Sequence, residues 1–254
     1  MAQARIDVRI RECVASVTIA NESKLNTLTR ALMEEFAAAV DELGDDSQLR
    51  AVIVTGSGNR AFIGGADIGE MSRLNPTTGR EFITKLHRCC DALRDLPVPV
   101  IARIDGYALG AGLEIAAACD LRIASDTSRF GMAEVKVGIP SVIEAALLPP
   151  LIGWGRTRQM LLLGETIGTA EAIVWGLIEK VVAAADLDAA VESWIGSILS
   201  AGQNAIRLQK QLIRRWEDLP MRDAIAAGID CFATSWESDE PREMMQAFLD
   251  RRGR

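Results

Sequence analysis

The chain has 254 residues, of which 49% are hydrophobic, with a net charge of −7 and an isoelectric point near 5.0. This length allows one large core, in one or two domains. The negative charge argues against nucleic acid or an anionic membrane as a partner of the whole chain. No apolar run approaches the ~18 residues of a membrane span. Only local basic clusters could bind a phosphate, for example Lys210 with Arg214 and Arg215.

Cysteine and histidine usage points to a reduced protein without a metal centre. The five cysteines are odd in number, lack C-x-x-C spacing and include the adjacent pair Cys89 and Cys90. His87 is the only histidine, and we expect it to be a partly buried helix residue. The first residues lack the apolar core of a signal sequence. We therefore expect a cytoplasmic location.

The first part of the chain alternates between strand and helix patterns. Apolar periodicity predicts strands at 14–20, 51–55 and 100–104, with helices at 28–43 and 77–96. Alternation of this kind is typical of an α/β core.

The second part becomes helical. A short helix is predicted at 113–119 and a strand at 121–124, and from Ile143 onward the pattern is helical to the end. Breaks are expected at Gly153, Gly164, Gly176, Gly202 and Pro220. The division that we predict is an α/β core over residues 1–200 and an α-helical region over residues 201–254.

Two turns of small residues stand out, at 63–68 (IGGADI) and 108–114 (ALGAGLE). Each follows a β-rich stretch and opens a helix-like one, so each can present backbone N–H groups to a ligand. N–H groups from two turns, aimed at one point, would hold a developing oxyanion. Glu114 ends the second turn and Glu134 follows nearby, so two carboxylates could move protons there. The pattern predicts chemistry next to a thioester carbonyl.

A dinucleotide-binding turn is the competing interpretation of the segment 51–58 (AVIVTGSG). A helix should begin at these glycines, but the chain returns to an apolar strand and another turn at 59–65. The context therefore argues against a nicotinamide-dependent dehydrogenase.

Several motifs together resemble the enoyl-CoA hydratase/isomerase (crotonase) superfamily. They are the runs at 61–71, 105–114 and 119–124 and the ending at 243–249. Their order and spacing agree with that family as well as their content does. The likeness extends from about Val14 to Arg251, nearly the whole chain.

The resemblance implies a fold, an assembly and a substrate. The fold would be a crotonase-like spiral of ββα turns, with C-terminal helices that pack on neighbouring subunits in a homotrimer or a hexamer. The substrate would be an acyl-CoA thioester, and no separate cofactor is expected because coenzyme A is part of that substrate. By position, the N–H groups of Ala66 and Ala111 would hold the thioester oxygen. The second position is usually glycine, and alanine does not favour a left-handed backbone.

The same resemblance assigns the two acids. Glu114 would activate a water for attack at Cβ, and Glu134 would protonate Cα of the enolate-like state. Family isomerases commonly lack an acid at the Glu114 position. Both acids therefore favour an enoyl-CoA hydratase, or the reverse dehydration, over a Δ3-Δ2 isomerase or another crotonase-type lyase. A non-catalytic acyl-CoA-binding module is the alternative of another class.

By the same resemblance, further residues would contact the substrate. Each of them also has an alternative interpretation as a purely structural residue. They are Lys24, Leu25, Gly64, Asp67, Ile68, Gly110, Pro140, Ser141, Trp236 and Phe248. Asp67 is also a good helix cap, and Trp236 and Phe248 could pack between helices or subunits. Glu134 could instead pair with Lys136 or Arg122.

One segment departs from the family pattern. After Pro140 the family hydratases commonly continue with a glycine-rich stretch, whereas this chain reads SVIEAALLP over 141–149. Ser141 takes a glycine position whose N–H faces the catalytic water, and Glu144 is an additional acid. We therefore expect a rebuilt acyl-chain wall, and with it an unusual acyl group or a hydroxyacyl-CoA dehydratase.

Overall fold

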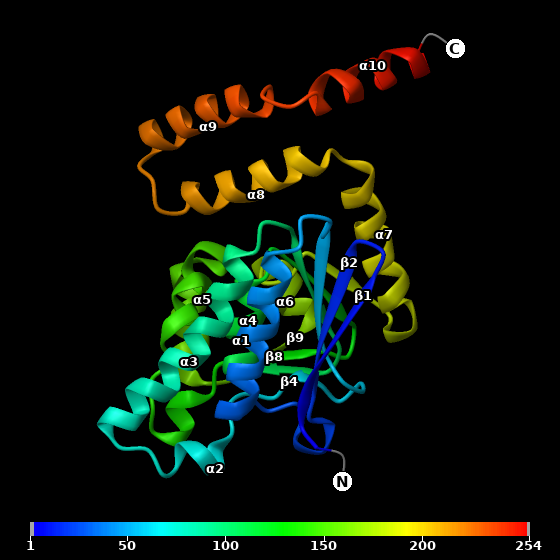
Figure 1. The fold of residues 1–254 in the computed structure, drawn as a ribbon. Helices are drawn as coiled ribbons and strands as arrows, with labels where there is room; N and C mark the ends of the chain where they lie inside the picture. The colour runs from blue at the N-terminus through cyan, green and yellow to red at the C-terminus, as the bar shows by residue number, and fades with distance from the viewer. Residues whose placement is uncertain (1–2, 253–254) are drawn as a thin grey trace.

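The computed structural model describes residues 3–252, and its strands form two sheets (Figure 1). The first sheet has the order β1 (Arg5–Arg11), β2 (Val14–Ala20), β3 (Ala51–Gly56), β5 (Val100–Ile104), β7 (Leu121–Ser125) and β10 (Lys180–Val182). The second has the order β4 (Ala61–Ile63), β6 (Tyr107–Leu109), β8 (Arg129–Gly131) and β9 (Thr166–Gly168).

The chain visits the two sheets in turn. From β3 to β8, each strand of the first sheet is followed by a strand of the second, giving the pairs β3–β4, β5–β6 and β7–β8. The first two pairs lead into helices: α2 (Ile68–Met71) with α3 (Pro76–Asp95), and then α4 (Ala111–Ala118). Successive strands of each sheet run parallel through this repeat. The predicted ββα spiral is therefore confirmed.

Helices cover both faces of the first sheet. On one face, α1 (Arg30–Gly44) begins at its N-cap Thr29 and buries Phe36 and Val40 in the main core, beside α3. On the other face, α7 (Leu187–Ser200) packs on Ile101 and Ile123 in a second core. Burial on both faces explains why β3 and β5 are almost continuously apolar in sequence.

The rest of the chain is mainly helical, and its last three helices lie as a layer beyond this body (Figure 1). It comprises α5 (Leu148–Leu163), α6 (Thr169–Trp175), α7, α8 (Gln203–Trp216), α9 (Met221–Ser235) and α10 (Glu240–Arg252). Helix α9 packs on α8, where the Trp216 Nε1–H donates to the Ala224 carbonyl at 2.9 Å. Between residues 3 and 252, no helix is both long and apolar enough to cross a bilayer.

The prediction that everything after Ile143 is helical is wrong at β9 and β10. These three-residue strands form because β9 pairs with β8 and β10 pairs with β7, and elements this short carry no periodicity of their own. The predicted glycine breaks agree with the structure: Gly153 kinks α5, while Gly164 and Gly176 end helices in the left-handed conformation.

Candidate active site

The two small-residue turns lie side by side because the strands before them are paired. Ile63 of β4 is the register partner of Ala108 of β6, and Ala66 and Ala111 each follow three residues later. A Cβ added at Gly65 would lie 3.4 Å from the Leu109 carbonyl oxygen, so the turns are in contact. Parallel pairing thus brings the predicted N–H donors to one edge of the second sheet.

The Ala66 N–H is not used by the backbone pairing around it. Ala66 forms an isolated parallel bridge with Leu28. The bonds of that bridge run from the Leu28 N–H to the Gly65 carbonyl at 2.9 Å and from the Asp67 N–H to the Leu28 carbonyl at 2.9 Å. Neighbouring peptide groups of an extended segment point to opposite sides. The Ala66 N–H therefore points away from Leu28.

The Ala111 N–H belongs to the first residue of α4, where N–H groups have no partner within the helix. The left-handed conformation in this turn falls on Gly110, with φ +50°, and not on Ala111. Alanine therefore fits the usual glycine position without backbone strain. The close approach of another chain segment also requires glycine at 112, since a Cβ there would lie 2.1 Å from the Ile63 carbonyl oxygen.

Glu114 is a buried carboxyl on the first turns of α4, with only 4% of its surface exposed. Loss of solvation on burial, and then the nearby Glu134 and Glu144 carboxylates, raise the pKa of Glu114 to about 8. The nearby Ala145 N–H, which donates to the Val142 carbonyl at 2.9 Å, opposes part of the rise in pKa. Glu114 is therefore a core residue and not part of the exposed surface of the helix.

Glu134 opens the short 3-10 helix η2 (Glu134–Val137) and faces the second turn. Its Oε1 lies 2.5 Å from where a Cβ of Gly110 would be, so Gly110 is needed for this approach. Its Oε2 accepts a hydrogen bond from the Ser141 Oγ–H at 2.8 Å. Arg122 pairs with Glu179 instead, so the alternative pairing of Glu134 with Arg122 is wrong.

The first turn gathers five of the predicted contact residues. The Gly64 N–H donates to the Leu25 carbonyl at 2.8 Å, and Lys24 Nζ lies 3.3 Å from the Asp67 carboxylate. Asp67 also caps α2 by accepting from the Glu70 N–H at 3.0 Å, as its alternative interpretation predicted. Ile68, the next residue, is largely exposed.

Buried Asn26 holds the loop before α1 against residues 57–61, and it was not predicted from the sequence. Its amide donates to the Ser57 and Ala61 carbonyls, and its Oδ1 accepts from the Asn21 N–H. The LNT run after Lys24 offers no periodic signal that marks Asn26 as buried.

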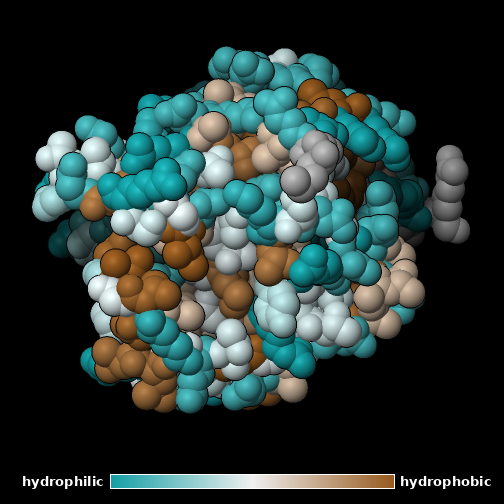
Figure 2. All heavy atoms as spheres, turned by 90° about the horizontal axis from the view of Figure 1, so that it is seen from below, coloured by the Kyte–Doolittle hydropathy of each residue, from teal (hydrophilic) through white to brown (hydrophobic). Residues whose placement is uncertain are grey.

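The segment Ser141–Ala146, which departs from the family pattern in sequence, lines a cleft of about 610 Å³ together with residues of α5. Pro140 is exposed and precedes it. Residues from the α5 side include Pro149, Trp154 and Leu161, so the cleft is mainly apolar. In the view from below, hydrophobic side chains gather on the left, the side on which α3 and α5 lie in Figure 1 (Figure 2).

The structure does not bring Trp236 and Phe248 to this site within one chain. Trp236 follows the last turn of α9 and Phe248 lies on α10, in the layer beyond α8 (Figure 1). Contacts from these two residues to a substrate thus stay a prediction that needs a neighbouring subunit.

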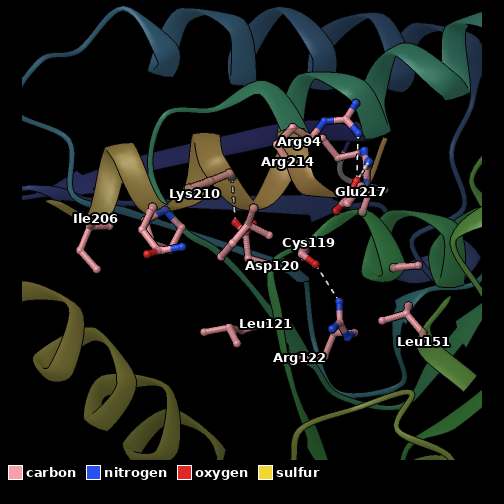
Figure 3. A pocket seen from close by; sticks show the side chains of 15 residues that line it. Arg94, Cys119, Asp120, Leu121, Arg122, Leu151, Ile206, Lys210, Arg214 and Glu217 are labelled. Carbon is pink, nitrogen blue, oxygen red and sulfur yellow. Dashed lines mark hydrogen bonds and ion pairs between the residues drawn. The ribbon is translucent and has the colours of Figure 1, made fainter. Parts of the chain in front are cut away.

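A second cavity, of about 340 Å³, lies between α8 and the start of β7 (Figure 3). Buried Lys210 pairs with Asp120 at 2.8 Å and donates to the Leu93 and Val98 carbonyls. Arg214, at the same cavity, pairs with Glu217 at 3.1 Å. These cations are already neutralised, so the expectation that Lys210 helps bind a phosphate is not supported.

The arrangement of these groups as a whole indicates a class of enzyme. Two outward-pointing N–H groups at adjoining turns, beside one buried and one half-buried carboxyl, suit an enzyme that stabilises an oxyanion while moving protons on neighbouring carbons.

Comparison with known proteins identifies the family. Residues 9–254 match the enoyl-CoA hydratase/isomerase family, and the chain belongs to it. The chain is 36% identical to the short-chain-enoyl-CoA hydratase of Clostridium acetobutylicum, over 94% of this chain and 92% of that protein. It is 34% identical to the crotonyl-CoA hydratase of Syntrophomonas wolfei, over 99% and 97%. The crystal structure of an enoyl-CoA hydratase from Bacillus anthracis superposes with a TM-score of 0.93, at 30% identity over 97% and 96% of the chains.

Proposed function

We propose that the protein is an enoyl-CoA hydratase, which adds water across the α,β double bond of a 2-enoyl-CoA to give the 3-hydroxyacyl-CoA and also catalyses the reverse dehydration. The observation that carries this proposal is the pairing of buried Glu114 with Glu134 beside the second turn. The hydratase names of the two curated relatives support it.

In the proposed hydration, Glu114 as a carboxylate takes a proton from water while the water oxygen bonds to Cβ. The π electrons move toward the thioester oxygen, where the Ala66 and Ala111 N–H groups stabilise the negative charge. Glu134 then gives its proton to Cα as the enolate collapses. One water is added, and the proton of the pair ends on Glu114.

The raised pKa of Glu114 places the resting proton of the pair on that residue. This distribution suits dehydration directly. Glu134 removes the α proton, and Glu114 protonates the departing hydroxyl. Hydration begins from the other distribution, with the proton on Glu134, so each turnover in that direction requires the proton to move between the carboxyls.

A Δ3-Δ2 isomerase or another crotonase-type lyase is the second candidate, since one acid–base residue suffices to shift a double bond. A buried carboxyl is costly to keep without a use, and Glu114 has no cation partner among residues 3–252. The same cost argues against a non-catalytic acyl-CoA-binding module. We assign the acyl group to the apolar cleft beside Ser141, which adjoins Glu134.

The test is a panel of 2-enoyl-CoA thioesters of different length and branching. Loss of the ultraviolet absorbance of the conjugated thioester, with a product heavier by one water, supports hydration. An isomer of unchanged mass supports the isomerase, and binding without turnover supports the binding module.

The pH dependence of kcat/KM follows from the shared proton. The reactive pair carries one proton, which leaves with a pKa of about 8, and two ionised carboxylates cannot protonate Cα or the hydroxyl. We expect kcat/KM to fall about tenfold per pH unit above that point in either direction of reaction. A profile that stays flat well above pH 8, measured with one substrate under initial-rate conditions, would contradict the shared-proton assignment.

We further propose assembly into a trimer or a hexamer through the C-terminal helices. Ile225, Ile229 and Phe232 form one exposed apolar face of α9, at 58%, 67% and 66% exposure, while Ala224 and Ala227 face inward. Light scattering should give three or six times the chain mass of 27.5 kDa, and Ile229→Glu should reduce it. A monomeric wild-type protein would refute the assembly.

A further inference from the structure

A third carboxyl lies beside the two predicted acids. Glu144 stands on the 3-10 helix η3 (Ile143–Leu147), which packs against both α3 and α4, and it is only 7% exposed. Its Oε1 lies 2.8 Å from Nδ1 of His87, the only histidine of the chain, on α3. Its Oε2 is buried without a nitrogen or oxygen partner among the described residues.

The segment that carries Glu144 contacts both acids of the proposed mechanism. Ser141 donates to Glu134 at 2.8 Å, and Ala145 lies near Glu114, where its N–H lowers the pKa of that carboxyl. Between them, Ile143 has φ +42°, a left-handed conformation that β-branched residues avoid. The surrounding contacts must hold the segment in this conformation. The His87–Glu144 contact connects this segment to α3.

We propose that Glu144, held by His87, is a positioning residue of the active site, whose negative charge adds to burial and to the Glu134 carboxylate in keeping the shared proton on Glu114. The inference rests on the proposed role of Glu114. A buried carboxylate with an unsatisfied oxygen repels a second carboxylate strongly, because little water screens the two charges. Glu114 can relieve that repulsion by retaining its proton.

The other groups around Glu144 do not cancel this effect. Glu114 faces it from α4 and Glu134 adds negative charge from η2, while His87 and Cys90 face it from α3. Burial raises the pKa of the Cys90 thiol well above its usual value, so the thiol stays neutral. The His87 side chain is 46% exposed, so water weakens its compensation of the Glu144 charge.

The experiment measures the titration of Glu114 without any substrate. Infrared difference spectra against pH follow the protonated-carboxyl stretch, and Glu114→Gln identifies the band. Glu144→Gln should lower the pKa of Glu114 by less than the loss of the Glu134 carboxylate does, whereas Glu144→Asp, which keeps the charge, should leave it close to the wild-type value. Glu192→Gln, an exposed charge change on α7, is the matched control.

A Glu114 titration that is unchanged in Glu144→Gln overturns the inference. Thermal unfolding shows whether that variant folds, and Glu144→Ala removes the same charge if it does not. In kinetics, the pKa above which kcat/KM falls should decrease by the same amount in Glu144→Gln. If the wild type hydrates no enoyl-CoA but the band still shifts, the proposed function fails while the electrostatic role of Glu144 stands.

Discussion

Glu114→Gln is expected to lower kcat for hydration by roughly 10²–10⁴-fold and to leave acyl-CoA binding nearly intact. Glutamine keeps the shape of the side chain, but it cannot take a proton from water. The measurements are the initial rate with a 2-enoyl-CoA and the Kd of a saturated acyl-CoA. A near-normal rate would remove Glu114 from the mechanism.

The same variant should be more stable than the wild type near neutral pH. Between its ordinary value of 4.5 and about 8, Glu114 ionises in the unfolded chain but stays protonated when folded, so the free energy of unfolding falls as pH rises. At pH 7 the substitution should recover up to about 3 kcal/mol. Below pH 4.5 both states are protonated and the gain should vanish, which denaturant unfolding at the two pH values checks. A gain that does not depend on pH would contradict this account.

Glu134→Gln is expected to cause a second loss of roughly 10²–10⁴-fold, with a different signature. Without this acid the enolate-like state cannot be protonated at Cα, so incorporation of solvent deuterium at Cα in deuterium oxide should fall with the overall rate. The pKa of Glu114 should also fall, because the Glu134 carboxylate is a cause of its rise.

Ser141→Ala is the matched control for Glu134→Gln. It removes only the 2.8 Å hydrogen bond to Glu134 and should reduce kcat far less than the loss of the carboxyl does. Deuterium incorporation at a wild-type rate in Glu134→Gln would show that another group protonates Cα.

Elements with strong periodicity could be predicted from the sequence. Strand β5 was predicted with its exact bounds, and α3 differs from its predicted range by one residue at each end. Strands β1, β6 and β8 were not predicted, and β9 and β10 were assigned to helix. Most of these have three residues and exist through their pairing with distant strands, which no local pattern encodes.

The backbone donors and the two acids were assigned from the family resemblance, with Ala66, Ala111 and Glu114 within the two turns and Glu134 beyond the second. The surroundings of the two acids could not be predicted from the sequence. The Ser141 hydroxyl bond to Glu134 and the His87–Glu144 contact join segments up to 57 residues apart. Glu144 could be noticed as an extra acid, but its burial and its histidine partner follow only from the packing of η3 on α3 and α4.

The most direct test of the central claim is the reaction of crotonyl-CoA in isotopically labelled water, with the wild type, Glu114→Gln and Glu134→Gln compared side by side. We expect the wild type to form 3-hydroxybutyryl-CoA with the label in the new hydroxyl, and each variant to lose most of this activity. A wild type that adds no water to crotonyl-CoA or to longer and branched 2-enoyl-CoAs, or two variants that both hydrate at near-normal rates, would contradict that claim.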